Sequence, residues 1–206
     1  MKRVLTLAII VLGLVAFSVP AYALPVNLSN VFSGTINAAG PYAQVTLSQV
    51  TGGVRFEVTN LTAGNLAGGS SKLFEFSFNY KGTSALNYTE PAGWDIKGFT
   101  SNAYKADGDG SFDFLVAGIG ETFLGTGNTL TFTILGDTNV NNFIDDSVGG
   151  DKGAFKFAAH IGSLANPAGG SAWVGDGTGV MLPEPGTMIL LGLGLLGLGI
   201  VVRKRS

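Results

Sequence analysis

Phe74-Glu75-Phe76-Ser77-Phe78-Asn79-Tyr80 is the stretch that decides the fold class. Aromatic residues occupy every second position of it, and polar residues fill the positions between them. Because successive side chains of a β-strand point to opposite faces, this alternation predicts a strand with one buried and one polar face.

The same period of two recurs on both sides of this stretch. It is seen in residues 45–47, 54–58, 112–116, 130–134 and 155–161, with clusters of Gly, Asn and Ser between the runs. The pair Gly52-Gly53 separates two of these runs and predicts a hairpin turn. No interval carries apolar residues at helical spacing beyond a turn or two.

Strands that each bury one face pack well as two stacked antiparallel sheets. We therefore predict an all-β fold, an antiparallel β-sandwich of the jelly-roll-like kind, over residues 24–182. A small barrel is the alternative. A glycine-rich exit loop is expected to begin at about residue 162.

The amino-terminal segment has the order of a secretory signal peptide, predicted here as residues 1–23. Met1-Lys2-Arg3 is basic, residues 4–19 are apolar, and Ala21-Tyr22-Ala23 supplies small residues for cleavage after Ala23. The chain contains no cysteine, so it forms no disulfide and carries no lipoprotein anchor. These features fit an exported protein that its core alone stabilises.

The body between the two ends is mildly acidic. Residues 24–182 hold seven basic and thirteen acidic side chains, a net charge of −6, and no basic cluster. We therefore expect no nucleic-acid partner and no attraction to an anionic membrane surface.

The carboxyl-terminal segment, residues 183–206, has three parts. Pro183-Glu184-Pro185 comes first, an apolar run extends over 187–202, and the basic tail 203–206 includes Arg203, Lys204 and Arg205. The run is near the lower length limit for a membrane span, and we predict a transmembrane helix over 187–202. Because basic residues beside a span stay in the cytoplasm, the prolines are expected on the outer side.

These three parts, in this order, resemble the PEP-CTERM sorting signal of Gram-negative bacteria. The resemblance implies that exosortase, a membrane-embedded cysteine protease-transpeptidase, recognises Pro183, Glu184 and Pro185 and removes the tail. It also implies an intermediate anchored in the inner membrane, delivery to the cell surface or extracellular matrix, and a setting of exopolysaccharide and biofilm. An ordinary anchor with a proline-rich stalk is the alternative.

An acidic loop offers candidate calcium ligands. Asp137, Asn139 and Asn141 stand at alternate positions, and Asp145 follows in the same loop. The pattern resembles a calcium loop of the dockerin or EF-hand type, since calcium takes about six to eight oxygen ligands. The twelfth position is Val148 rather than Glu or Asp. A calcium site and a metal-free acidic surface loop both remain open at this point.

A second acidic stretch, Asp107–Asp113, also places oxygen side chains at alternate positions. Phe112 stands where an EF-hand loop needs glycine, and the strand pattern begins at the same residue. We favour a hairpin turn with solvated carboxylates here.

Several aromatic residues lie outside the clearest strand patterns. Trp94 is the candidate for stacking on a sugar ring, Tyr88 and Tyr104 are further candidates, and Trp173 is expected to pack instead. His160, the one histidine of the chain, alternates out of register with its apolar neighbours and is expected on a polar face.

The sequence shows no catalytic constellation, and we expect no enzymatic activity. We expect an exported structural protein of the surface or matrix, associated with exopolysaccharide. A carbohydrate-binding or calcium-binding module is the alternative, followed by a secreted hydrolase.

Overall fold

The computed structural model describes residues 23–36, 39–62, 71–107, 110–165 and 168–177. Within these residues the chain forms fourteen β-strands and one short 3-10 helix. They are β1 (Ala23–Gly34), β2 (Ala43–Val50), β3 (Gly53–Asn60), β4 (Lys72–Phe78), β5 (Asn87–Tyr88), β6 (Trp94–Lys97), β7 (Tyr104–Lys105), β8 (Gly110–Phe112), β9 (Phe114–Gly118), β10 (Leu124–Gly125), β11 (Thr129–Leu135), η1 (Val140–Phe143), β12 (Val148–Gly149), β13 (Phe157–Ala165) and β14 (Ala168–Asp176).

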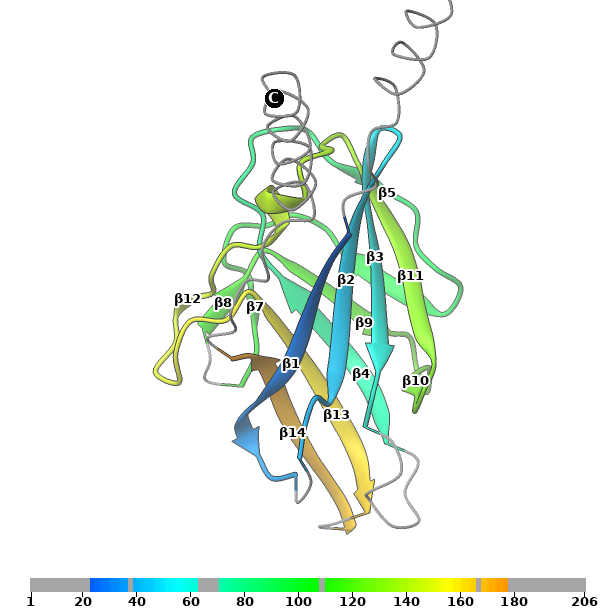
Figure 1. Cartoon of the computed structure of the whole chain (residues 1–206), viewed down its shortest axis with the longest axis vertical. Coiled ribbons are helices and arrows are strands. Elements are labelled where there is room, and N and C mark those ends of the chain that lie inside the picture. Colours follow the sequence, from blue (N-terminus) through cyan, green and yellow to red (C-terminus); the bar gives the residue numbers. More distant parts are fainter. Residues whose placement is uncertain (1–22, 37–38, 63–70, 108–109, 166–167, 178–206) are drawn as a thin grey trace, which may run out of the picture. The chain divides into compact units, whose positions relative to one another are not determined.

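The strands form one large antiparallel sheet and one small one. The large sheet has the order β5-β11-β3-β2-β1-β14-β13-β4-β9-β6, with β10 added beside β4 (Figure 1). The small sheet has the order β12-β8-β7. The all-β, antiparallel class predicted from the sequence is confirmed.

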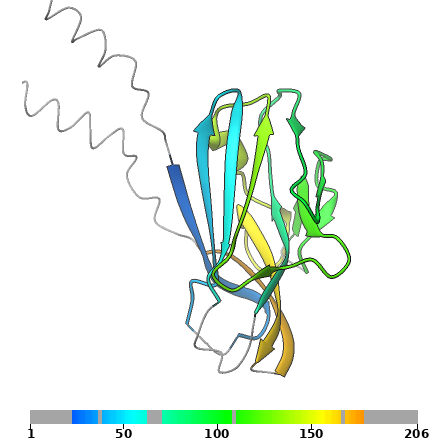
Figure 2. The ribbon, with the colours of Figure 1, turned by 90° about the vertical axis from the view of Figure 1, so that its right-hand side faces the viewer.

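The large sheet curls into a nearly closed, barrel-like arrangement rather than separating into two stacked sheets. The reason lies in β1, which pairs with β2 through residues 23–28 and with β14 through residues 28–34. Its register shifts after Leu28 and again after Val31, and such bulges bend a strand and increase its twist. One strand therefore belongs to both walls, and the barrel alternative describes the fold better than the sandwich. In Figure 2, β2, β3 and β11 lie on one side, and β8 and β9 on the other.

A buried amide links the two walls at one end of the barrel. Asn60, the last residue of β3, is fully buried, and its side chain donates to the carbonyl oxygens of Leu124 at 2.9 Å and Ser71 at 3.2 Å. Its backbone N–H donates to the carbonyl oxygen of Asn128, just before β11. These contacts tie β3 to the β10 segment and the start of β4.

The interior of the barrel is filled mainly by phenylalanine rings. Phe56 of β3 stacks on Phe132 of β11 at 4.9 Å, and Phe78 of β4 stacks on Phe114 of β9 at 4.7 Å. Phe56 and Phe78 come from opposite walls, and their ring centroids are 4.7 Å apart. Burial of these rings stabilises the folded protein, and the aromatic pairing at these distances stabilises it further.

One strand departs from the predicted alternation. Along β4 the register against β13 shifts between Glu75 and Leu73, so Phe74 occupies a bulge. Leu73 is therefore fully buried, whereas Phe74 is half-buried. The expected inward direction of Phe74 is wrong, while Phe76, Phe78 and Tyr80 are buried as predicted.

The predicted run 112–116 is divided between the two sheets. Phe112 ends β8 in the small sheet, Phe114 begins β9 in the large sheet, and Asp113 lies between them. Phe112 packs with Ala106 and Ala158 in a second small core, against which Phe32 and Trp173 are also packed. The small sheet thereby contacts the outer face of the large one.

Candidate functional site

The residues predicted to direct sorting lie outside the described residues. These are Ala21, Pro183, Glu184, Pro185, Arg203, Lys204 and Arg205, together with the predicted span 187–202. Ala23, the residue before the predicted cleavage point, is the first residue of β1. In the part of the chain that the structure describes, no helix has both the length and the apolar character needed to cross a membrane.

Asp137 of the predicted calcium loop is an internal hydrogen-bond acceptor. Its Oδ1 accepts the backbone N–H of Asn139 at 2.8 Å, and its Oδ2 accepts the side-chain amide of Asn142 at 2.7 Å and the hydroxyl of Tyr80 at 2.8 Å. Partial burial opposes ionisation, but these three donors prevail and lower the pKa of Asp137. The carboxylate thus organises the loop.

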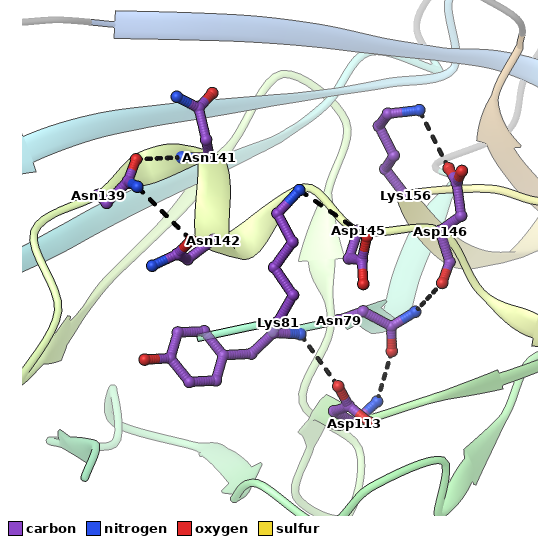
Figure 3. Close-up of polar contacts among 10 residues, drawn as sticks. Asn79, Lys81, Asp113, Asn139, Asn141, Asn142, Asp145, Asp146 and Lys156 are labelled. Atoms are coloured by element: carbon purple, nitrogen blue, oxygen red, sulfur yellow. Dashed lines mark hydrogen bonds and ion pairs between the residues drawn. The ribbon is translucent and has the colours of Figure 1, made fainter. Parts of the chain in front are cut away.

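The other candidate calcium ligands also have protein partners or point elsewhere. The side-chain oxygen of Asn139 accepts the backbone N–H of Asn141 at 3.1 Å and caps η1. Asn141 itself points away from Asp145 (Figure 3). Asp145 lies 3.9 Å from the ammonium group of Lys81, a cation that competes with a metal for the same carboxylate.

A metal-binding cluster is not assembled in residues 23–36, 39–62, 71–107, 110–165 and 168–177. No group of three or more His, Cys, Asp or Glu side chains comes together there in a way that could hold a metal ion. The calcium role of Asp137, Asn139, Asn141 and Asp145 stays a prediction, and the hydrogen bonds of Asp137 give the loop a structural role.

Asp113, the last residue of the second acidic stretch, is buried and links three segments. Its carboxylate accepts the backbone N–H groups of Tyr80 at 3.0 Å and Asn102 at 2.8 Å. Its own N–H donates to the side-chain oxygen of Asn79, whose amide donates to the carbonyl oxygen of Asp146 (Figure 3). The expected solvated carboxylate is therefore wrong for this residue, which is 8% exposed.

A groove lies where the two ends of the large sheet face each other. It has a volume of about 430 Å³ and is lined by residues 84–86 and Tyr88 from the segment around β5, and by residues 98–100 and Tyr104 from the segment after β6. We call it the seam groove. Tyr88 and the backbone of Gly98 approach so closely that a Cβ atom at Gly98 would lie 2.2 Å from the Tyr88 hydroxyl.

Phe99 is the most exposed aromatic residue of the seam groove. Its side chain is 50% exposed, yet its ring lies edge-on to Tyr80 at 5.8 Å and is 6.0 Å from Phe114. Partial burial and the hydrogen bond to Asp137 raise the pKa of Tyr80, so its hydroxyl stays protonated and remains a donor at neutral pH. Two buried aromatic residues thus hold an exposed ring in place.

The predicted aromatic ligands fall into two groups. Tyr88 and Tyr104 both line the seam groove, and their role as ligand residues stays a prediction. Trp94 is 5% exposed, so its ring offers little surface to a sugar, and its ligand role stays a prediction without such support. Phe99 was not among the candidates predicted from the sequence, although its position outside the strand patterns was a usable signal.

His160 and Trp173 form a stacked pair on the outer face of the large sheet. Their ring centroids are 4.9 Å apart, and Phe74 lies 5.9 Å from His160. Partial burial lowers the pKa of His160, against the opposing effect of Glu75 and Asp107. His160 lies on the face opposite its buried neighbours Ala159 and Ile161, but Phe74 and Trp173 surround it there, so the expected polar surroundings are wrong. Trp173 packs against the second small core, as expected.

Comparison with known proteins adds one finding about the carboxyl-terminal segment. A family model described as the PEP-CTERM protein-sorting motif matches residues 182–205. No curated protein and no solved structure matches the chain. The match confirms the resemblance seen in Pro183-Glu184-Pro185 and in the basic residues that follow. This chain carries a PEP-CTERM protein-sorting motif, the signal that marks an exported protein for exosortase.

Proposed function

We propose that this protein is a non-enzymatic component of the cell surface or extracellular matrix, associated with exopolysaccharide. The observation that carries the proposal is the PEP-CTERM motif over residues 182–205. In this proposal the protein passes through an intermediate anchored in the inner membrane by residues 187–202. Exosortase then releases the body from this anchor near Pro183-Glu184-Pro185.

A structural role is supported by the composition of the chain. One histidine and no cysteine rule out a cysteine nucleophile and leave a single histidine for a zinc site or a Ser-His-Asp triad. The seam groove is lined by aromatic and hydroxyl groups, which favours a carbohydrate partner over calcium as the second candidate. Asp137 already accepts three hydrogen bonds from the protein, which also disfavours calcium as the ligand.

The role of the motif is tested in a host cell that expresses the full chain. Pro183, Glu184 and Pro185 are replaced together by alanine, and the carboxyl terminus is followed by a tail-specific antibody. We expect the variant to retain residues 186–206 and to stay in the membrane fraction, because exosortase no longer recognises it.

A matched control carries alanine at Thr178, Val180 and Met181, which lie just before the matched segment and keep the length of the chain unchanged. The control should be processed like the native protein. Normal tail removal in the Pro183-Glu184-Pro185 variant would show that exosortase does not process the protein through this motif.

A further inference from the structure

We infer that the seam groove binds a neutral sugar unit of a polysaccharide, stacked on the exposed face of Phe99. The inference rests on the proposed association with exopolysaccharide, and it assigns to that association a site and a ligand class. Residues 84–86, Tyr88, 98–100 and Tyr104 line the site.

The stacking surface is formed before a ligand arrives. Phe99 is 50% exposed, but Tyr80 and Phe114 contact its ring from within the barrel. Tyr80 is itself fixed through its hydroxyl, which donates to Asp137 at 2.8 Å. A ring held in this way loses little conformational freedom when a ligand binds. Binding therefore carries only a small entropic cost for ordering this side chain.

The wall that carries Phe99 is anchored by Asp113. The Asp113 carboxylate accepts the N–H of Asn102, and the Asp113 carbonyl oxygen accepts the N–H of Thr100. The Tyr104 hydroxyl donates to the carbonyl oxygen of Gly98 at 3.3 Å. The middle of the segment 98–104 is thereby fixed to Asp113, and its two ends are joined to each other.

The opposite wall is anchored by Tyr80 and the end of β11. The N–H of Ser84 donates to the Tyr80 hydroxyl at 3.2 Å, and Tyr88 pairs with Ile134 in the large sheet. A Cβ atom at Gly136 would lie 2.1 Å from the carbonyl oxygen of Ala85, so these two backbones are in close contact. Both walls are therefore attached to the rigid barrel, and the groove between them is preformed.

The lining of the seam groove combines hydroxyl groups with one apolar ring. Ser84, Tyr88, Thr100 and Tyr104 contribute hydroxyl groups, and Phe99 contributes an apolar face. None of the described residues that line the groove carries a charge. A ligand suited to this surface has hydroxyl groups at its edge, one flat apolar face and no net charge, which is the description of a neutral sugar ring.

The charge of the body supports the same choice. Residues 24–182 have a net charge of −6, which disfavours a polyanion such as a uronic acid polymer. A volume of about 430 Å³ lies within the range of small-ligand sites and has room for one or two sugar rings of a longer chain.

The inference is tested by titrating the full chain in detergent with laminarin, dextran and galactomannan as neutral probes, and with alginate as an anionic probe. We expect a neutral probe to bind and alginate not to bind. Phe99→Ala should weaken the binding by about tenfold or more, as truncation of a central aromatic contact does elsewhere.

Two further variants complete the design. Phe99→Leu keeps the apolar packing on Tyr80 and Phe114 but has no flat ring, so it should fold and still lose the affinity. Phe123→Ala removes another exposed phenylalanine, outside the groove, and should bind like the native chain. Equal binding by the native and Phe99 variants, tight alginate binding, or no binding of any neutral probe would overturn the inference.

Cosedimentation with exopolysaccharide extracted from the host separates this inference from the proposed function. A native chain that cosediments together with both Phe99 variants would leave the proposed function standing and remove the groove from it. A native chain that binds a neutral probe through Phe99 but does not cosediment would contradict the proposed function alone.

Discussion

The hydroxyl of Tyr80 donates a hydrogen bond of 2.8 Å to Oδ2 of Asp137, a residue 57 positions further along the chain. This contact joins the end of β4 to the acidic loop after β11. It also fixes the ring on which Phe99 rests in the seam groove. The acidic loop that contains Asp137, which the sequence pattern suggested as a calcium site, thus helps to hold Phe99 in the seam groove.

Tyr80→Phe tests the energetic weight of this contact. The substitution removes the donor to Asp137 and the acceptor for the N–H of Ser84, and keeps the ring. We expect the free energy of unfolding to fall by about 1–2 kcal/mol, the net value of one or two hydrogen bonds of which one is to a charged group. Urea denaturation measures the change.

The control for this measurement is Tyr88→Phe, which removes the hydroxyl of a half-buried tyrosine at the seam groove. We expect it to change the free energy of unfolding by less than about 0.5 kcal/mol. Equal losses in the two variants would mean that the contact with Asp137 has no particular weight.

Leu73→Ala and Phe74→Ala test the bulge in β4. Leu73 is fully buried and Phe74 is half-buried, so the smaller side chain should matter more. We expect Leu73→Ala to cost about 2–5 kcal/mol and Phe74→Ala about 1 kcal/mol. If Phe74→Ala were the more destabilising of the two, the uninterrupted alternation read from the sequence would be right and the bulge wrong.

The pH dependence of stability tests the acceptor role of Asp137. Its pKa is lowered in the folded protein from an ordinary value of 3.8, so folding favours the ionised carboxylate. The stabilisation is complete above the unfolded pKa and is lost as the pH falls through the folded pKa. Asp137→Asn cannot titrate, so the native protein should exceed it in stability at pH 6 by more than at pH 2.

Denaturation of both proteins from pH 6 to pH 2 measures this difference. A gap in the free energy of unfolding that stays constant over this range would show that the ionisation of Asp137 is not coupled to folding.

Calcium should not stabilise the protein. Asp137 already accepts three hydrogen bonds, and the carboxylate of Asp145 lies 3.9 Å from the Lys81 ammonium group. We expect calcium to give no rise in melting temperature over a chelator, because a ligand that does not bind the folded state cannot raise its stability. A rise in melting temperature that Asp137→Asn abolishes would establish the calcium site instead.

The fold class could be predicted because the alternation of apolar and polar residues along a strand shows which of its faces is buried. The runs around Phe56 and Phe132 alternate as expected, and these two residues are buried. How the strands pair is set by contacts between distant segments. The two register shifts in β1 make one continuous sheet out of the expected two, and a local pattern of alternation does not encode them.

The candidate site was only partly predictable for a related reason. Tyr88 and Tyr104 could be selected as aromatic residues outside strand patterns, and both reach the seam groove. Phe99 contacts Tyr80 only because the segment before β5 lies beside the segment after β6 in the folded protein. This contact between distant segments cannot be read from a local pattern. Asp113 shows the converse, because a carboxylate in a polar-looking stretch becomes a buried acceptor once Tyr80 and Asn102 approach it.

Residues 182–205 match the PEP-CTERM protein-sorting motif, and we propose that the mature protein no longer carries the part that follows Pro183-Glu184-Pro185. Mass spectrometry of the carboxyl terminus of the protein, isolated from its native host, tests it most directly. The account predicts a carboxyl terminus close to Pro183-Glu184-Pro185 and no peptide from the basic tail. A mature protein that still ends in Arg203-Lys204-Arg205-Ser206 would contradict it.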